Sequence, residues 1–139
     1  MRFYSVAVTA LAIDAPHKWT DNLLSQHDVA EVAHRRRGVA RGITWQALVR
    51  IAVIRELHVR FGCAVREAVG LAGRLLDSPA EGSLEAGALA IVLDREALER
   101  GLHARLRDAL ESAPRPRRGR PPVKVRRGEG AHVVTPVEP

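Results

Sequence analysis

Arginine, glycine and proline cluster near the end of the chain in an order that suits the narrow groove of a nucleic acid. The cluster is Pro116-Arg117-Arg118-Gly119-Arg120-Pro121-Pro122. Gly119 lets the backbone lie close to the floor of an A·T-rich minor groove, where the enhanced negative potential attracts the Arg118 and Arg120 side chains. Alternatively, this composition makes a cationic tail that is merely solvated, or one that binds any polyanion through charge alone.

This cluster resembles an AT-hook, and the resemblance implies an A·T-rich double-stranded DNA partner. The residues it implicates are Arg117, Arg118, Gly119, Arg120 and Pro121. Lys124 extends the basic run and is expected to contact phosphates, a sequence-independent contact that weakens steeply with salt. Residues 114–139 hold several prolines and few apolar side chains. They cannot bury enough surface to offset the entropy of ordering, so the sequence predicts a disordered basic tail.

Charge is distributed unevenly along the 139 residues, whose formal net charge is +6. Residues 1–76 carry 11 cationic against 6 anionic side chains, residues 77–113 carry 4 against 8, and residues 114–139 carry 7 against 2. Because a basic surface is typical of nucleic-acid binding, we expect the two ends of the chain to contact DNA and the middle not to do so.

Several classes of protein are disfavoured by what the sequence lacks. The single cysteine, Cys63, excludes an intrachain disulfide framework and a cysteine-clustered zinc site, and we interpret it as a small buried hydrophobe. The six histidines form no pair at a metal-ligand spacing, and no catalytic constellation is found, so we predict no metal, no cofactor and no enzymatic activity. No apolar run reaches the roughly 18 residues of a membrane span, and no export signal is evident, so a cytoplasmic, nucleoid-associated protein is expected.

Two short helices are predicted at the start of the chain. Ser5 is the expected N-cap of a helix over residues 6–12, and Asp14 is the expected N-cap of a second helix that runs to about Gln26. The side chains expected to be buried are Val8, Leu11 and Ala12 in the first helix and Trp19, Leu23 and Leu24 in the second. Joined by a tight turn, the pair is a candidate helix-turn-helix whose second helix lies in the major groove. Its candidate DNA-contacting residues are His17, Lys18, Thr20, Asn22 and Gln26.

A basic turn between two predicted strands follows, with the strands expected around residues 29–32 and 39–43. The cations of this region are Arg35, Arg36, Arg37 and Arg41. The pattern is typical of a β wing whose arginines contact DNA phosphates, and the alternative is that the arginines simply solvate an exposed turn.

The segment after the wing begins with Arg41-Gly42-Ile43-Thr44, and Thr44 is the expected cap of a helix with an apolar residue at every third position. A glycine ends that helix, and another amphipathic helix is expected over residues 65–76. The apolar positions and the glycine are Leu48, Ile51, Ile54, Leu57 and Gly62. In this order of elements the segment resembles the winged-helix domain of the MerR family. The resemblance implies a winged helix-turn-helix DNA-binding domain over residues 1–76, in a mainly α fold with a small β wing.

Residues 77–113 are expected to hold a linker that includes Gly82-Ser83, a short strand at residues 89–93, and an amphipathic helix capped by Asp94 that ends near Ser112. The apolar stripe of this helix consists of Leu98, Leu102, Leu106 and Leu110, with Ala97 and Ala109 beside them. We favour pairing of this stripe with a second copy, because helix-turn-helix proteins commonly bind two half-sites with two-fold symmetry. The alternative is that the helix folds back on its own domain.

Taken together, these features predict a homodimeric, sequence-specific DNA-binding transcriptional regulator. Its winged helix would bind the major groove while its tail binds an adjacent A·T-rich minor groove, and the tether would make the second contact effectively intramolecular. Two alternatives remain. One is an antitoxin-like DNA-binding protein that neutralises a protein partner through residues 77–113, with the helix at 94–112 as its surface. The other is a nucleoid-type architectural protein that coats A·T-rich DNA.

Overall fold

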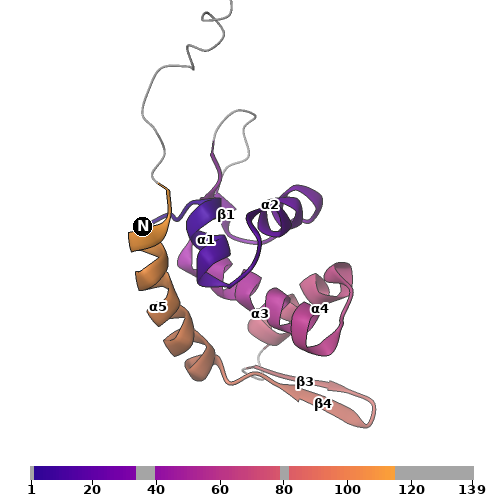
Figure 1. Ribbon diagram of the computed structural model, residues 1–139. Coiled ribbons are helices and arrows are strands. Elements are labelled where there is room, and N and C mark those ends of the chain that lie inside the picture. The colour runs from indigo at the N-terminus through magenta and orange to yellow at the C-terminus, as the bar shows by residue number, and fades with distance from the viewer. Residues whose placement is uncertain (1, 34–39, 79–81, 115–139) are drawn as a thin grey trace, which may run out of the picture.

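Helices dominate the computed structural model, which describes residues 2–33, 40–78 and 82–114 (Figure 1). In those ranges five helices accompany two separate two-stranded antiparallel sheets, so the prediction of a mainly helical fold is confirmed. The helices are α1 (Val6–Ala12), α2 (His17–Gln26), α3 (Trp45–Phe61), α4 (Val65–Asp77) and α5 (Arg95–Ser112). The strands are β1 (Val32–Ala33), β2 (Gly42–Ile43), β3 (Ser83–Ala86) and β4 (Leu89–Val92). None of these helices is long and apolar enough to cross a bilayer.

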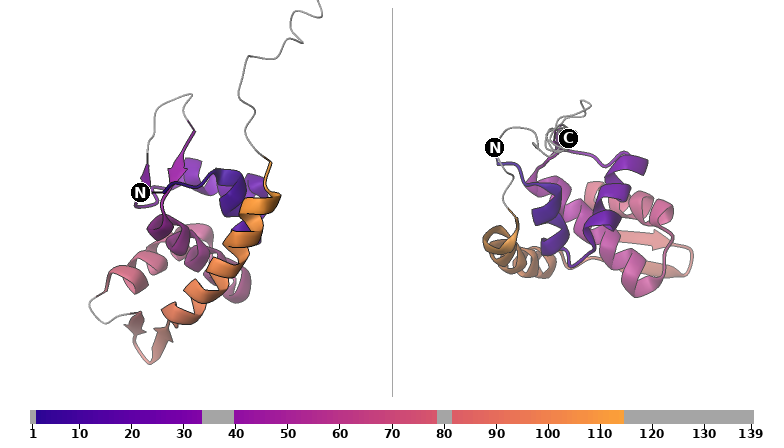
Figure 2. Two further views of the ribbon diagram at one scale, coloured as in Figure 1. Left: turned by 90° about the vertical axis from the view of Figure 1, so that its left-hand side faces the viewer. Right: turned by 45° about the horizontal axis from the view of Figure 1, so that its top comes forward.

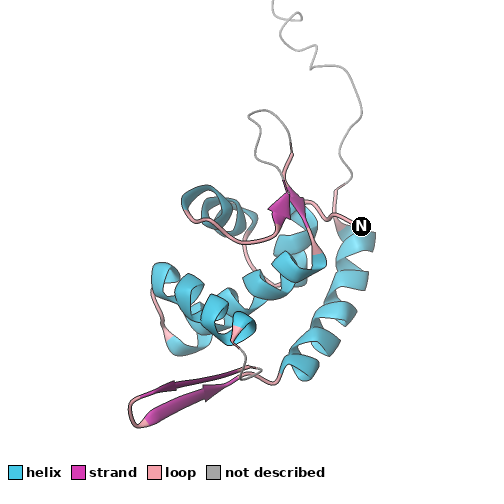
Figure 3. Ribbon diagram, turned by 180° about the vertical axis from the view of Figure 1, so that it is seen from behind, coloured by secondary structure: helices cyan, strands magenta, loops and turns pink. Residues whose placement is uncertain are grey.

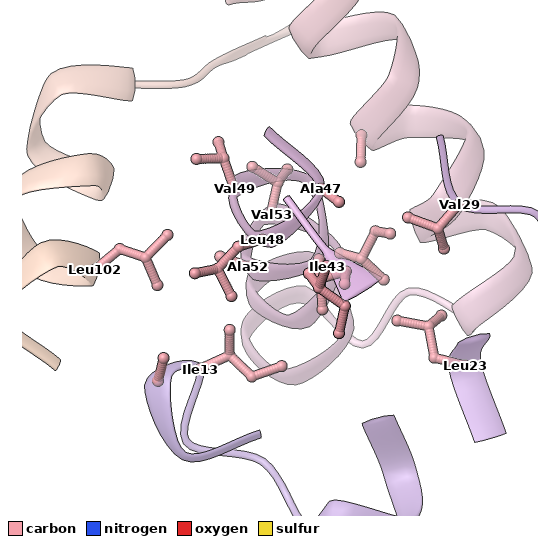
Figure 4. Packing of buried hydrophobic residues seen from close by; sticks show 14 of the residues in the cluster. Ile13, Leu23, Val29, Ile43, Ala47, Leu48, Val49, Ala52, Val53 and Leu102 are labelled. Carbon is pink, nitrogen blue, oxygen red and sulfur yellow. The ribbon is translucent and has the colours of Figure 1, made fainter. Parts of the chain in front are cut away.

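Helix α3 forms the centre of the hydrophobic core, because apolar side chains occupy most of its positions. Both α4 and α5 pack against it. Figure 4 shows Leu48 of α3 among Ile13 from the end of α1, Leu23 from α2, Ile43 from β2 and Leu102 from α5. Leu48, Ile43 and Leu102 are fully buried, so one core joins segments from most of the described chain.

The predicted ends of α1 and α3 are confirmed, because each rests on local hydrogen-bond chemistry. The Ser5 Oγ atom accepts a hydrogen bond from the Val8 N–H (3.1 Å), and the Thr44 Oγ1 atom accepts one from the Ala47 N–H (3.1 Å). Gly62 then ends α3 in the left-handed region at φ 68°, which glycine adopts without steric cost.

The connection between α1 and α2 differs from the sequence prediction at Asp14. Asp14 has a left-handed conformation (φ 54°) just after α1, where its N–H donates to the Leu11 carbonyl oxygen (3.2 Å). Pro16 occupies the N-cap position of α2, and no side chain caps that helix. The predicted N-cap at Asp14 is therefore wrong, because this residue ends the first helix instead of starting the second.

Helix α1 lies against both α2 and α5 and is buried on more than one side (Figure 2). Val8 and Ala12 are buried as predicted, and Thr9 is buried with them. The prediction is wrong for Leu11, which is 47 % exposed. Leu11 lies about 200° around the helix from Thr9, so the two side chains point in nearly opposite directions.

The sheet formed by β1 and β2 follows the predicted order, although its strands are shorter than expected. Val32 pairs with Ile43 in an antiparallel register. Tyr4 pairs with the other edge of β2: its N–H donates to the Ile43 carbonyl oxygen (2.8 Å), and its carbonyl oxygen accepts from the Ile43 N–H (3.0 Å). Val29, predicted in a strand, instead belongs to the buried core.

Strands β3 and β4 form a hairpin that extends from the body of the molecule at the end opposite β1 (Figure 3). Leu84 pairs with Ile91 and Ala86 pairs with Leu89, so a two-residue loop joins the strands. The sequence correctly predicts a strand near residues 89–93, but its assignment of Ser83 to a linker is wrong. Ser83 begins β3, which takes its conformation from pairing with β4.

Helix α5 folds back on its own chain and packs along α1, with further contacts to α3. Asp94 caps it as predicted, since its Oδ1 atom accepts a hydrogen bond from the Ala97 N–H (3.0 Å). Leu102 and Leu106 are buried, whereas Leu110 remains 39 % exposed. The leucine stripe that we favoured for pairing with a second copy is thus largely covered within the chain.

Candidate nucleic-acid interface

Helix α2 lies at the upper end of the molecule in Figure 1, and its outer face is polar. Lys18, Asn22 and Gln26 are exposed and recur every four residues, which aligns them along one side of the helix. His17 is exposed at the start of the helix. Four of the five residues predicted from this helix therefore have side chains that a ligand can reach.

Thr20 is the exception, and its assignment to the outer face is wrong. The residue is fully buried, and its Oγ1 atom donates a hydrogen bond to the Pro16 carbonyl oxygen (3.3 Å). Thr20 lies about 200° around the helix from Lys18, on the side that contains the buried Leu23. A contact between Thr20 and a ligand would require the helix to leave its packing position.

An aromatic and cationic cluster fixes α2 against α3. The Arg55 guanidinium lies over the Trp19 ring (4.8 Å to the ring centroid), and the His58 ring stacks on the same indole at 5.9 Å between centroids. Arg55 also donates to the Asp14 carbonyl oxygen (3.3 Å), and His58 Nδ1 lies 2.8 Å from the Cys63 carbonyl oxygen. The contacts of Arg55 and His58 with Trp19 hold α2 in a defined orientation on α3.

Arg41 links the β1–β2 sheet to α2. Its guanidinium forms an ion pair with the Asp21 carboxylate (2.9 Å) and donates a hydrogen bond to Ser25 Oγ (3.1 Å). The arginine side chain is 29 % exposed and that of Asp21 is 50 % exposed. The pair places a positive charge beside the one carboxylate of α2, next to the outer face that holds Lys18. An anionic ligand on that face would therefore meet a neutralised carboxylate.

The N-terminal segment lies along β2, and the sequence predictions assigned it no role. Arg2 is exposed, with its guanidinium 5.5 Å from the Tyr4 ring centroid. The Phe3 ring covers Gly42 of β2, so closely that a Cβ at residue 42 would approach the ring within 3.0 Å. The sequence does hold a signal for this segment, namely the adjacent aromatic residues Phe3 and Tyr4 directly before the Ser5 cap. Such a pair stands out because aromatic residues make up only 4 % of the chain.

The remaining predicted cations fall outside the described residues. They comprise Arg35, Arg36 and Arg37 of the wing turn and Arg117, Arg118, Arg120 and Lys124 of the tail, together with Gly119 and Pro121 of the AT-hook-like cluster. The structure describes the residues that flank these segments. In the sequence, β1 precedes and β2 follows residues 34–39, and the last turn of α5 lies at the same end of the molecule as β1 (Figures 1 and 2).

The described surface thus combines a helix with exposed hydrogen-bonding side chains, a short sheet linked to it by an ion pair, and an arginine near the N-terminus. Within the described ranges, no three His, Cys, Asp or Glu side chains are placed to hold a metal ion together. No protein-family model, curated protein or solved structure matches this chain.

Proposed function

We propose that this protein is a sequence-specific DNA-binding transcriptional regulator in which α2 is the recognition helix. The observation that carries the proposal is the division of α2 into two faces. Lys18, Asn22 and Gln26 are exposed on its outer side, while Trp19 and Leu23 attach its inner side to the core. Insertion into a major groove requires a helix whose inner side is packed on the core and whose outer side is polar.

The outer side chains suit base recognition chemically. Asn22 and Gln26 each offer a donor and an acceptor in the arrangement that adenine presents in the major groove, and Lys18 suits guanine or a phosphate. Thr20 has no part in this contact because it is buried. Arg41 contributes indirectly, since its pairing with Asp21 limits the repulsion between that carboxylate and DNA phosphates.

The wing and the tail supply the remaining contacts in this proposal. Arg41 links the β1–β2 sheet to α2, and the resemblance to the MerR family implies that the basic segment between these strands contacts DNA phosphates. The tail would bind an A·T-rich minor groove next to the site read by α2. Only three residues separate Pro114 from Arg118, a span of about 14 Å when extended, so the tail would bind close to the end of α5.

Fluorescence anisotropy tests this function directly. The full chain and a chain that ends at Ala113 are titrated with fragments of the DNA upstream of the protein's own gene, at two salt concentrations and with an A·T-rich competitor. We expect the shorter chain to keep its preference for one fragment at the higher salt, with lower affinity. Loss of the preference together with the tail would contradict recognition by α2 and would favour an architectural protein.

A further inference from the structure

The β3–β4 hairpin exposes an unusual amount of apolar surface for a two-stranded sheet. Leu89 and Val92 are each 75 % exposed, and Glu85 is the only charged residue between Ser83 and Val92. The pairing register places the side chains of Leu84, Ala86, Leu89 and Ile91 on one face. This apolar face begins against α4 and continues outward along the hairpin.

The outer edge of the hairpin is also open for pairing. The Leu93 N–H donates to the Gly82 carbonyl oxygen (2.7 Å), so these two residues form a hydrogen-bonded pair just before Ser83 and Val92. Hydrogen-bonded and non-hydrogen-bonded pairs alternate along an antiparallel ladder. Ala90 and Val92 consequently direct their backbone N–H and C=O groups away from β3. Because β3 lies on the side of α4, this edge of β4 faces outward.

Natural proteins usually protect such an edge with a charged residue, a proline or a bulge. Leu89–Val92 contains no charged residue and no proline, and its regular pairing with β3 leaves no bulge. A two-stranded hairpin needs either a further strand or packing against a helix to be stable in water, and only the inner part of this apolar face, at Leu84 and Ile91, packs on the core. The unprotected edge and the exposed outer part of the face indicate that a further strand adds to β4.

We propose that β4 is a self-association strand, which pairs in antiparallel fashion with β4 of a second copy about a two-fold axis at Ala90. The residues around this axis follow a large-small-large pattern. Leu89 would lie opposite Ile91 of the second copy, and the two Ala90 residues would lie opposite each other. The product is a four-stranded sheet that carries the apolar faces of both hairpins on the same side.

Charge favours a second copy over a partner of another kind. The hairpin has no cluster of charges that would attract an oppositely charged partner, and its only carboxylate lies opposite Ala90 on β3. In the proposed sheet the two Glu85 residues are three strand spacings apart, about 14 Å, which exceeds the Debye length of about 8 Å at physiological ionic strength. Association at the hairpin also leaves α2 free, because the two lie at opposite ends of the molecule (Figure 1).

Sedimentation velocity of the full chain without DNA tests the proposal. We expect wild type to shift from monomer toward dimer between about 1 and 100 µM, and Leu89→Glu to weaken that association at least tenfold. Ala90→Pro should act similarly, because it removes an N–H that points away from β3 and so leaves the hairpin itself intact. Phe61→Glu is the control, since Phe61 at the end of α3 is as exposed (74 %) but belongs to neither strand of the hairpin. A wild type that stays monomeric throughout, or equal losses in all three variants, would overturn the proposal.

Disulfide cross-linking then tests the position of the axis. In a Cys63→Ser background, Ala90→Cys places two thiols directly opposite each other, and we expect a covalent dimer on mild oxidation. Ala104→Cys, on the exposed side of α5, should remain monomeric. Cross-linking at residue 104 alone would assign association to α5, and cross-linking at neither position would leave β4 free for a foreign protein, so either result overturns the proposal. Neither result bears on DNA recognition by α2.

Discussion

The two ends of this molecule present opposite kinds of surface. At one end, α2 exposes Lys18, Asn22 and Gln26, and Arg41, directly before β2, neutralises the nearby carboxylate of Asp21. At the other end, the β3–β4 hairpin exposes aliphatic side chains with a single charged residue. Polar groups with fixed orientation suit recognition of a charged, hydrogen-bonding ligand, whereas an uncharged apolar strand suits another protein surface. The two ends of this small chain therefore suit two different kinds of partner.

Helix α5 connects the two ends. It begins beside the hairpin and runs to α1, where Arg105 Nε donates to the Ala12 carbonyl oxygen (2.8 Å). Along the way it contacts α3, since the Trp45 indole donates to Glu99 (3.1 Å) and stacks on the His103 ring at 4.1 Å between centroids. Because one helix contacts both the hairpin side and α1, the ends are held within one cooperative core.

We expect the greatest loss of stability when the packing of α5 is disrupted. Leu102→Ala removes a fully buried side chain from the α5 interface and should lower the free energy of unfolding by about 2–5 kcal/mol. Leu110→Ala, at a site that is 39 % exposed, should cost much less. Urea denaturation at a protein concentration of about 1 µM measures both variants. Similar costs for the two would contradict packing of α5 within the chain.

A substitution on α2 should weaken DNA binding, whereas a matched substitution on α4 should not. Lys18→Ala removes a cation from the outer face of α2 and should weaken binding about tenfold, with a shallower dependence on salt. Arg66→Ala removes an exposed arginine from α4 and should leave binding nearly unchanged. Anisotropy titrations at several salt concentrations provide the comparison. A larger loss for Arg66→Ala would move the DNA-binding surface away from α2.

The Arg41–Asp21 pair should also contribute to DNA affinity. Arg41→Ala exposes an unpaired carboxylate beside the bound DNA and should weaken binding several-fold. Asp21→Ala in addition should recover part of that loss, because the repulsive group is then absent. A double-mutant cycle on DNA affinity measures the coupling. Additive effects of the two changes would mean that Arg41 acts on DNA alone, without neutralising Asp21.

A second Arg–Asp pair, nearer the hairpin, should make a small contribution to stability. Arg50 donates two hydrogen bonds to the Asp77 carboxylate (2.9 and 3.1 Å), and these lower the pKa of Asp77 below its ordinary value of 3.8, against a smaller opposing effect of burial. A lowered pKa in the folded state stabilises the protein above pH 3.8, and this contribution is lost as the pH falls through the folded-state value.

Asp77→Asn should therefore destabilise the protein at neutral pH, by at most about 1 kcal/mol because the carboxylate is 63 % exposed. The difference from wild type should disappear in acid. Urea denaturation across this pH range tests the expectation, with Asp108→Asn on the exposed side of α5 as the control. A difference that persists unchanged in acid would show that the Arg50–Asp77 ion pair is not its source.

Local chemistry explains what the sequence predicted well. The side chains of Ser5, Thr44 and Asp94 each accept a hydrogen bond from an N–H three residues ahead, so the starts of α1, α3 and α5 depend only on nearby residues. The end of α3 at Gly62 is equally local. The exposed face of α2 was predicted nearly correctly, because its polar residues recur with the helical period.

The errors have non-local causes. Thr20 is buried because α2 packs on the core at that point, which a polar residue type does not reveal. Asp14 is favoured both as an N-cap and as a left-handed residue that ends a helix, and the second role prevails here. Ser83–Ala86 becomes a strand through pairing with β4, and α5 finds its partner in α1, far away in the sequence. The wing turn and the tail lie outside the described residues, so these predictions stay predictions.

We propose that the outer face of α2 recognises the DNA sequence. A direct test of this proposal compares wild type with Asn22→Ala, using the ratio of affinities for the preferred upstream fragment and for unrelated DNA at one salt concentration. We predict that this ratio falls about tenfold, mainly through weaker binding to the preferred fragment, because one base-edge contact contributes about 1–3 kcal/mol of discrimination. An unchanged ratio for Asn22→Ala, and for Gln26→Ala beside it, would contradict the claim.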